Sequence, residues 1–275
     1  MSSKFEHITT HLLQSHGVDI SKYDDDFLYN SLRKRITETH CASVEEYGAF
    51  LEKNNKEGKS LIDSLRISYS NLFRNPLTMA VLERILLPGM ILALKTTHRK
   101  EIRIWSAACA AGQEAYSLSI LMEELRNGST GPYAYRIFAT DISEARINEA
   151  RKGQFTADAL DNLNQKRIRQ WFTRHGETYT VKPELKENID FSVFDLFSEQ
   201  LSSPPASIFG DFNLVICANL LFYYKHEFRK IILEKVGSCL AKGGYLVTGE
   251  TERDILLRFN YHEIFPQSAI FSING

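Results

Sequence analysis

A run of small residues that ends in an acid is the first segment of the chain with chemical potential. It extends from Ser106 to Glu114 and has the sequence SAACAAGQE. Alanine and glycine let a ligand approach the backbone closely. The dinucleotide-binding pattern G-x-G-x-x-G is missing, and a carboxylate at Glu114 would repel a pyrophosphate. Glu114 therefore suits a cationic group such as an amine, or it is only an acid at a helix N-terminus, favoured by the helix dipole.

A second acid ends the segment Ala139-Thr140-Asp141. An acid at the end of a parallel strand is placed to accept hydrogen bonds from both hydroxyls of a ribose. The alternative for Asp141 is a local role as a turn or capping residue.

The elements that must position these acids follow from the hydrophobic pattern. From Glu101 onward apolar runs alternate with amphipathic segments, which predicts alternating strands and helices. The expected strands are Ile102–Ala107, Arg136–Asp141, Phe191–Phe194, Asn213–Cys217 and Tyr245–Thr248, and the expected helices are Gln113–Arg126, Ser143–Lys152 with Ser143 as N-cap, and His226–Leu240. Such alternation predicts an α/β fold with a doubly wound, Rossmann-like parallel sheet, in which ligands lie beyond the carboxyl ends of the strands.

The rest of the chain divides into three parts. Residues 1–75 form a small all-helical N-terminal domain, because apolar residues recur there at three and four spacing. Residues 76–100 form a connecting helix and linker, and we expect the helix Met79–Leu87 to end at Pro88-Gly89. The α/β domain occupies residues 101–275 and carries a small antiparallel β-subdomain inserted around 154–190.

Composition excludes several classes of protein. The 275 residues are 43% hydrophobic and 24% charged, which is typical of a globular protein, and the net charge of −1 gives no general attraction to nucleic acid. The four cysteines form no C-x-x-C pair, so we expect reduced thiols and no metal site. The apolar stretches Ile85–Leu94 and Leu214–Phe222 are too short to span a bilayer, and the N-terminus has no signal-peptide pattern. We therefore expect a cytoplasmic protein without membrane insertion.

Taken together, these features favour one cofactor. An acid for an amine, an acid for a ribose and a small-residue loop without a phosphate pattern suit S-adenosylmethionine better than a nicotinamide cofactor. A nicotinamide dehydrogenase is the least favoured alternative, and a methyltransferase for small molecules or nucleic acid ranks above it.

A family resemblance follows from these residues. The segment Trp105–Leu118, WSAACAAGQEAYSL, resembles the W-S-A-x-C-x-x-G-x-E-x-Y-S signature of the chemotaxis receptor methyltransferases, the CheR family. Further motifs of the family are matched in order by Leu72–Pro76 (F-F-R), Ala139–Ile142 (A-T-D-I), Ala150–Phe155 (A-R-x-G-x-Y), Cys217–Tyr224 (C-R-N-V-L-I-Y-F) and Leu240–Leu246 (L-x-P-G-G-Y-L). The resemblance implies that S-adenosylmethionine methylates glutamate side chains of chemoreceptors, with S-adenosylhomocysteine as the other product.

The resemblance also implies roles for individual residues. Arg74 and Tyr223 match the residues beside the methyl-transfer centre. The positions that match cofactor contacts are Ser68, Ser70, Arg74, Ala108, Glu114, Asp141, Asp195, Leu196, Asn219 and Leu220. A helix around Leu28–Ile36 carries Arg33, Lys34 and Arg35, which form either a solvated face or a contact for the acidic helices of a receptor. We expect a monomer.

Three residues depart from the family pattern. Ser68 and Asp195 stand where the family has asparagine, and both side chains still accept hydrogen bonds. Ala218 replaces the arginine of C-R-N, and the hairpin near His175 is short. These departures motivate an alternative function, a cofactor-binding regulatory or protein-interaction module of the same fold with lost or altered methyl transfer.

Overall fold

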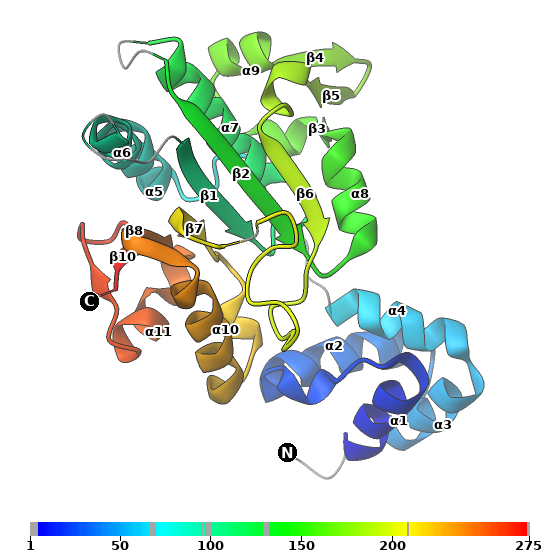
Figure 1. Ribbon diagram of the computed structural model, residues 1–275. Helices are drawn as coiled ribbons and strands as arrows, with labels where there is room; N and C mark the ends of the chain where they lie inside the picture. The colour runs from blue at the N-terminus through cyan, green and yellow to red at the C-terminus, as the bar shows by residue number, and fades with distance from the viewer. Residues whose placement is uncertain are drawn as a thin grey trace. The chain divides into compact units, whose positions relative to one another are not determined.

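The computed structural model describes residues 5–65, 70–94, 96, 101–128, 132–207 and 209–273. The chain forms two compact units (Figure 1). The first comprises Met1–Ile67 and Phe222–Arg229, and the second comprises Ser68–Leu221 and Lys230–Gly275.

Four helices build most of the first unit, namely α1 (Glu6–His16), α2 (Asp25–Glu38), α3 (Val44–Lys53) and α4 (Asn55–Leu65), with the short η1 (Ile20–Lys22) after α1. Asp24 and Ser43 start α2 and α3 by accepting backbone N–H groups of the first turn. The helices bury one shared apolar core, which includes Leu12, Leu32 and Tyr47. This arrangement confirms the predicted all-helical N-terminal part.

Arg35 corrects one expectation about α2. Arg33 and Lys34 are exposed, but the Arg35 side chain is only 17% exposed and pairs with Glu57, itself 7% exposed, at 2.6 Å. Arg35 sits three residues after the buried Leu32, which turns it toward α4 instead of outward. Arg35 is therefore a structural residue of the helical core and not part of a surface for a partner.

A segment from the far end of the chain completes the first unit. Tyr224 stacks on Tyr23 with ring centroids 5.1 Å apart, and Lys225 pairs with Asp25 at 3.0 Å. The backbone N–H of Asp24 also donates to the carbonyl of Tyr223 at 2.8 Å. Nothing in the local sequence pattern predicts this association, because it depends on contacts between residues that are more than 190 positions apart in the chain.

The second unit is built on a seven-stranded sheet with the order β6-β2-β1-β7-β8-β10-β9. The strands are β1 (Glu101–Ala107), β2 (Ala134–Asp141), β6 (Ile189–Val193), β7 (Phe212–Ile216), β8 (Leu240–Val247), β9 (His262–Glu263) and β10 (Ile270–Ser272). The first five run parallel, and the last two add an antiparallel edge. The predicted α/β class with a doubly wound sheet is confirmed.

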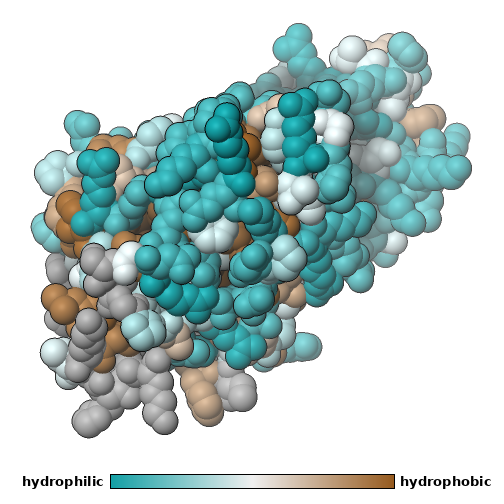
Figure 2. Space-filling view, turned by 90° about the horizontal axis from the view of Figure 1, so that it is seen from above, coloured by the Kyte–Doolittle hydropathy of each residue, from teal (hydrophilic) through white to brown (hydrophobic). Residues whose placement is uncertain are grey.

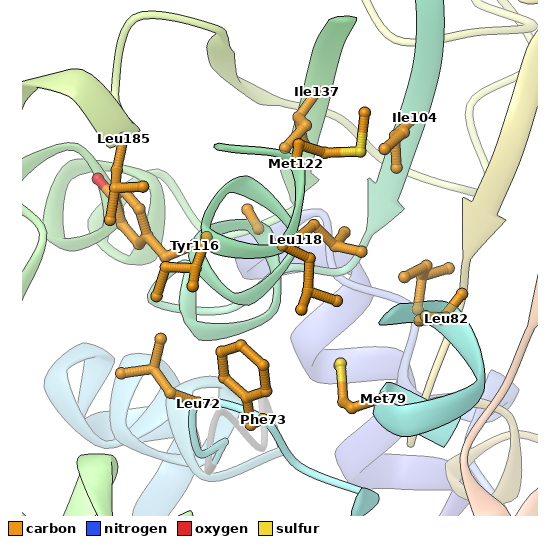
Figure 3. Close-up of a cluster of buried hydrophobic side chains, with 14 of the residues drawn as sticks. Leu72, Phe73, Met79, Leu82, Ile104, Tyr116, Leu118, Met122, Ile137 and Leu185 are labelled. Atoms are coloured by element: carbon orange, nitrogen blue, oxygen red, sulfur yellow. The ribbon is translucent and has the colours of Figure 1, made fainter. Parts of the chain in front are cut away.

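Helix α7 (Gln113–Arg126) lies between the sheet and the segment 72–82 (Figure 3). It is buried almost all round, which suits a helix covered on both sides. Met122 lies beside the sheet residues Ile104 and Ile137, and Leu118 lies between these residues and Phe73 (Figure 3). The helix that follows the small-residue loop is thus fixed firmly at the centre of the core.

The connecting helix differs from the expectation at its end. It continues through Pro88-Gly89 as α5 (Pro76–Val81), a π-helical turn η2 (Leu82–Leu86) and α6 (Leu87–Leu94). A proline inside a helix lacks the N–H donor and collides with the carbonyl four residues earlier. The π turn widens the helix just before Pro88, because the N–H of Leu87 bonds to the carbonyl of Leu82 five residues back.

The continuous helix Pro76–Leu94 is long and apolar enough to cross a membrane by length and composition, so the apolar stretch is longer than we expected. Its inner side chains, including Met79, Leu82 and Ile91, pack in the core of the second unit. Its outer side exposes Leu92, which is 64% accessible. Hydrophobic side chains also gather at the left of Figure 2, the side on which α6 lies in Figure 1. One third of this helix is buried inside the protein.

The remaining helices and the inserted β-subdomain follow the expected order. The subdomain is a sheet of β3 (Gln154–Thr156), β5 (Thr178–Val181) and β4 (Phe172–His175), with η3 (Ala157–Leu160), α9 (Gln165–Trp171) and η4 (Pro183–Leu185). The other helices are α8 (Glu144–Lys152), η5 (Leu221–Tyr223), α10 (His226–Ser238), η6 (Glu250–Glu252) and α11 (Arg253–Arg258). Ser143 accepts the backbone N–H of Arg146, as expected for the N-cap of α8.

Candidate active site

The carboxyl ends of four parallel strands lie together at one end of the sheet, and most of the predicted residues of the second unit come at or after these strand ends. In the register of the sheet Ala107 lies beside Thr140, Ser106 beside Ile216, and Asp141 beside Val193. The strand order reverses between β1 and β7, which is where doubly wound sheets bind their ligands. The segments that follow these strands carry Glu114, Asp141, Asp195, Leu196, Asn219 and Leu220.

The loop after β1 holds an unusual backbone. Ala108 and Ala110 have φ values of 61° and 49°, and Gly112 has a φ of 89°. Left-handed conformations are unfavourable for alanine and persist only where the surroundings impose them. Here the N–H of Cys109 donates to the carbonyl of Thr140 at 2.8 Å. Ala108 is partly exposed in this loop, whereas Cys109, Ala110 and Gly112 are buried.

Asp141 ties the loop to the end of β2. One carboxylate oxygen accepts the N–H of Ala110 at 3.0 Å, and the other accepts the N–H of Ser143 at 2.9 Å. The turn role considered for this residue is therefore present. It does not exclude a ligand role, since each carboxylate oxygen accepts more than one hydrogen bond.

Glu114 lies in the first turn of α7, as expected. The hydroxyl of Ser106 donates to its Oε1 at 2.5 Å. Burial raises the pKa of Glu114 to about 7, whereas the Ser106 hydrogen bond and the Arg74 charge act in the opposite direction and the Glu252 charge adds to the rise. Glu114 is thus a carboxylate that lacks enough positive charge around it, and a cationic ligand would supply that charge.

Arg74 lies within electrostatic reach of Glu114 and is held in a constrained backbone. Its neighbours Phe73 and Asn75 have φ values of 52° and 60°, and a positive φ at a bulky phenylalanine is rare. The N–H of Phe73 donates to the buried Ser117 hydroxyl at 2.8 Å. The guanidinium of Arg167 also lies 4.5 Å from the centroid of the Phe73 ring. Such strain is often found at functional sites, and it fixes the direction of the segment that carries Arg74.

The other predicted residues are placed as follows. Asn219 is left-handed, with a φ of 59°, and Asp195 accepts the N–H of Phe197 at 2.8 Å. Ser70 and Leu220 are partly buried and Leu196 is 8% exposed, whereas Ser68 lies outside the described residues. Tyr223 belongs to the helical unit, where its ring centroid lies 4.8 Å from that of Phe27.

Comparison with known proteins identifies the family. The family model "CheR methyltransferase, SAM binding domain" matches residues 68–264, and "CheR methyltransferase, all-alpha domain" matches residues 3–65. The chain belongs to the CheR methyltransferase family. Its second unit therefore carries the S-adenosylmethionine-binding domain of that family, as the resemblance implied.

Curated relatives agree with this assignment. A chemotaxis protein methyltransferase of Listeria innocua is 29% identical over 237 residues, covering 86% of this chain and 85% of the relative. Chemotaxis protein methyltransferase 1 of Pseudomonas aeruginosa is 31% identical over 196 residues, covering 70% of this chain and 68% of the relative. The chemotaxis protein methyltransferase of Escherichia coli is 27% identical over 255 residues, covering 90% and 83%.

The acceptor groups at the carboxyl end of the sheet in this CheR family member fit S-adenosylmethionine. The carboxylates of Glu114 and Asp141 match an ammonium group and a ribose diol. Next to Glu114, the Oε1 atom of Gln113 is buried and has no hydrogen-bond partner among the residues that the structure describes. A buried acceptor of this kind calls for a donor, and the amino group of the cofactor is one.

Three supporting residues escaped the sequence prediction of the site. Ser106 and Ser117 are part of the family signature, and that was the signal that could have marked them. Their hydrogen bonds with Glu114 and Phe73 are known only from the structure. Glu252 lies outside every motif that carries the family resemblance. It accepts hydrogen bonds from the segment after β7. No local pattern in the sequence marks it.

Proposed function

We propose that this protein transfers a methyl group from S-adenosylmethionine to glutamate side chains of chemoreceptors and so forms glutamyl methyl esters. The observation that carries the proposal is Arg74, held by a constrained backbone within electrostatic reach of Glu114 in the S-adenosylmethionine-binding domain. The names of the relatives, chemotaxis protein methyltransferases, support the receptor as the substrate. Such a reaction belongs to the cytoplasm, where we place the protein, acting as a monomer.

The residues of the site would hold the cofactor by charge and hydrogen bonding. Glu114, with Gln113 beside it, would accept the ammonium group, and Asp141 would accept the ribose hydroxyls. The residues that would border the adenine and ribose follow β6 and β7. They are Asp195, Leu196, Asn219 and Leu220. Ser68, Ser70 and Ala108 complete the proposed contacts.

When bound, S-adenosylmethionine supplies a methyl group activated on a sulfonium sulfur. A glutamate substrate needs no general base, because its pKa near 4.3 leaves it almost fully ionised at pH 7. Arg74 would hold the substrate carboxylate and aim one oxygen at the reacting carbon. For Tyr223, the role beside the methyl-transfer centre is the one that the family resemblance implies. Positioning of this kind can supply about 7–11 kcal/mol of the barrier reduction in favourable cases.

The exposed Arg33 and Lys34 of α2 provide the positive charge that we propose for contact with acidic receptor helices. Arg35 is excluded from this contact by its pairing with Glu57.

The experiment that tests the proposal uses S-adenosylmethionine labelled in its methyl group and cytoplasmic fragments of chemoreceptors. We expect label on the fragment that is released as methanol by mild base, as an ester requires. Arg74→Ala should abolish transfer, and Arg74→Lys should restore only part of it because lysine lacks the planar guanidinium. Absence of base-labile label on every fragment, with normal binding of S-adenosylhomocysteine, would contradict the proposal and favour a binding module.

A further inference from the structure

Glu252 is a wholly buried acid that joins the segments after two neighbouring strands. Its side chain is 0% exposed and lies at the end of η6, beyond β8. Oε2 accepts the N–H of Asn219 at 2.7 Å, and Oε1 accepts the N–H of Leu221 at 2.6 Å. Both donors belong to the segment that follows β7.

The same carboxylate also orders its own turn. Oε2 accepts the hydroxyl of Thr248 at 2.8 Å and the N–H of Gly249 at 2.9 Å. Burial of a carboxylate is costly unless hydrogen bonds satisfy its oxygens, and four donors converge on this one. Glu252 therefore fixes the turn after β8 and the turn after β7 to each other.

The turn after β7 needs such an anchor. Asn219 holds a left-handed backbone, with a φ of 59°, which asparagine tolerates better than most residues but which remains unfavourable. A Cβ atom added at Gly249 would lie 2.6 Å from the Nδ2 atom of Asn219 and 2.9 Å from Oε2 of Glu252. A side chain at position 249 would therefore displace the amide of Asn219 or the carboxylate of Glu252.

We propose that Glu252 is a positioning residue for the cofactor: by holding the backbone N–H groups on both sides of Leu220, it places Asn219 and Leu220 at the sheet edge. This proposal rests on the proposed function in assigning those two residues, and Glu114, to the cofactor. The negative charge of Glu252 also contributes, after burial, to the raised pKa of Glu114. The positive charge of Arg74 opposes that of Glu252 and lowers the pKa of Glu114. The hydroxyl of Ser106 donates a neutral hydrogen bond to Glu114.

The first test compares Glu252→Gln with the purified wild-type protein in calorimetric titrations with S-adenosylhomocysteine from pH 6 to pH 8. Glutamine presents an NH2 group to at least one of the present donors, so we expect the dissociation constant to rise at least tenfold. The loss of negative charge should also move the pH midpoint of binding, set by Glu114, to lower pH. A residue that acted on the fold alone, with no charge effect on Glu114, would not move that midpoint.

Two further variants separate charge from geometry. Glu252→Asp keeps the charge but shortens the reach, so it should weaken binding without lowering the pH midpoint. Glu250→Gln, an exposed neighbour in the same turn, is the matched control and should change neither quantity. Binding of S-adenosylhomocysteine by Glu252→Gln within twofold of wild type, with an unchanged pH midpoint, would overturn the proposal.

A measurement on the wild-type protein covers the case in which Glu252→Gln does not fold. Hydrogen exchange should show the amides of Asn219 and Leu221 strongly protected without ligand, and exchange as fast as in an unstructured peptide would overturn the proposal. A different experiment tests the proposed function, which requires that the wild-type protein transfer a methyl group to a receptor fragment. Loss of S-adenosylhomocysteine binding in Glu252→Gln without transfer by the wild type would support the positioning role alone.

Discussion

The pKa of Glu114 makes a quantitative prediction about cofactor binding. A carboxyl group with a pKa of about 7 is roughly one tenth ionised at pH 6 and roughly nine tenths ionised at pH 8. If only the ionised form accepts the ammonium group of S-adenosylhomocysteine, the dissociation constant should fall about tenfold between these pH values, or about 1.4 kcal/mol. At pH 7 binding should release about half a proton per ligand.

The assay is isothermal titration at pH 6, 7 and 8, repeated at pH 7 in buffers that differ in their enthalpy of ionisation. Proton release makes the observed binding enthalpy depend on the buffer. Glu114→Gln is the control, because it keeps the shape of the side chain and removes its titration. The variant should bind more weakly, and any pH dependence that it retains does not come from Glu114.

Stability of the ligand-free protein should change in the opposite sense. Because the folded-state pKa of Glu114 is raised from 4.5 to about 7, the protonated acid favours the folded state, an effect complete below pH 4.5 and lost as the pH rises through 7. The shift corresponds to about 3 kcal/mol at most in the free energy of unfolding. Equal affinity of the wild type at pH 6 and pH 8, with no proton release, would refute the role of Glu114 as the ammonium acceptor.

Three further predictions concern other parts of the molecule. Ser117→Ala should leave a buried N–H without an acceptor, lower the free energy of unfolding by about 1–3 kcal/mol in urea titrations, and reduce turnover more than the affinity for S-adenosylhomocysteine. Asp141→Asn should weaken S-adenosylhomocysteine binding at least tenfold by calorimetry, because its amide cannot accept all the bonds that the carboxylate accepts. The double variant Arg33→Glu with Lys34→Glu should raise KM for a receptor fragment and leave the stability unchanged. Arg35→Ala should instead lower the free energy of unfolding by about 3–5 kcal/mol in thermal or urea unfolding, since it breaks a largely buried ion pair.

The sequence predicted well wherever the hydrophobic period was regular. The helix Gln113–Arg126 has the expected bounds, and β1 and β2 differ from their expected bounds by one or two residues at their starts. Glu114 and Asp141 could be placed at the sheet edge because the carboxyl ends of parallel strands share one edge. These predictions depend on contacts between neighbours in the chain or on the rules of sheet topology.

Other features depend on contacts that no local pattern reveals. Pro88 predicted a helix end, but a π turn removes the clash and lets the helix continue. Arg35 has the same type as its exposed neighbours, and only the position of Glu57 on another helix turns it inward. Glu252 has the same type as Glu250 two residues earlier, and only the fold gives it the donors of the turn after β7.

The most direct test of the central claim is mass spectrometry of a chemoreceptor cytoplasmic fragment after incubation with the protein and S-adenosylmethionine. The account predicts the added mass of one methyl group on a glutamate side chain, its removal by mild base, and no such product with Arg74→Ala. A fragment left unmodified by a wild-type protein that binds S-adenosylhomocysteine, or a methyl group on any other kind of atom, would contradict the account.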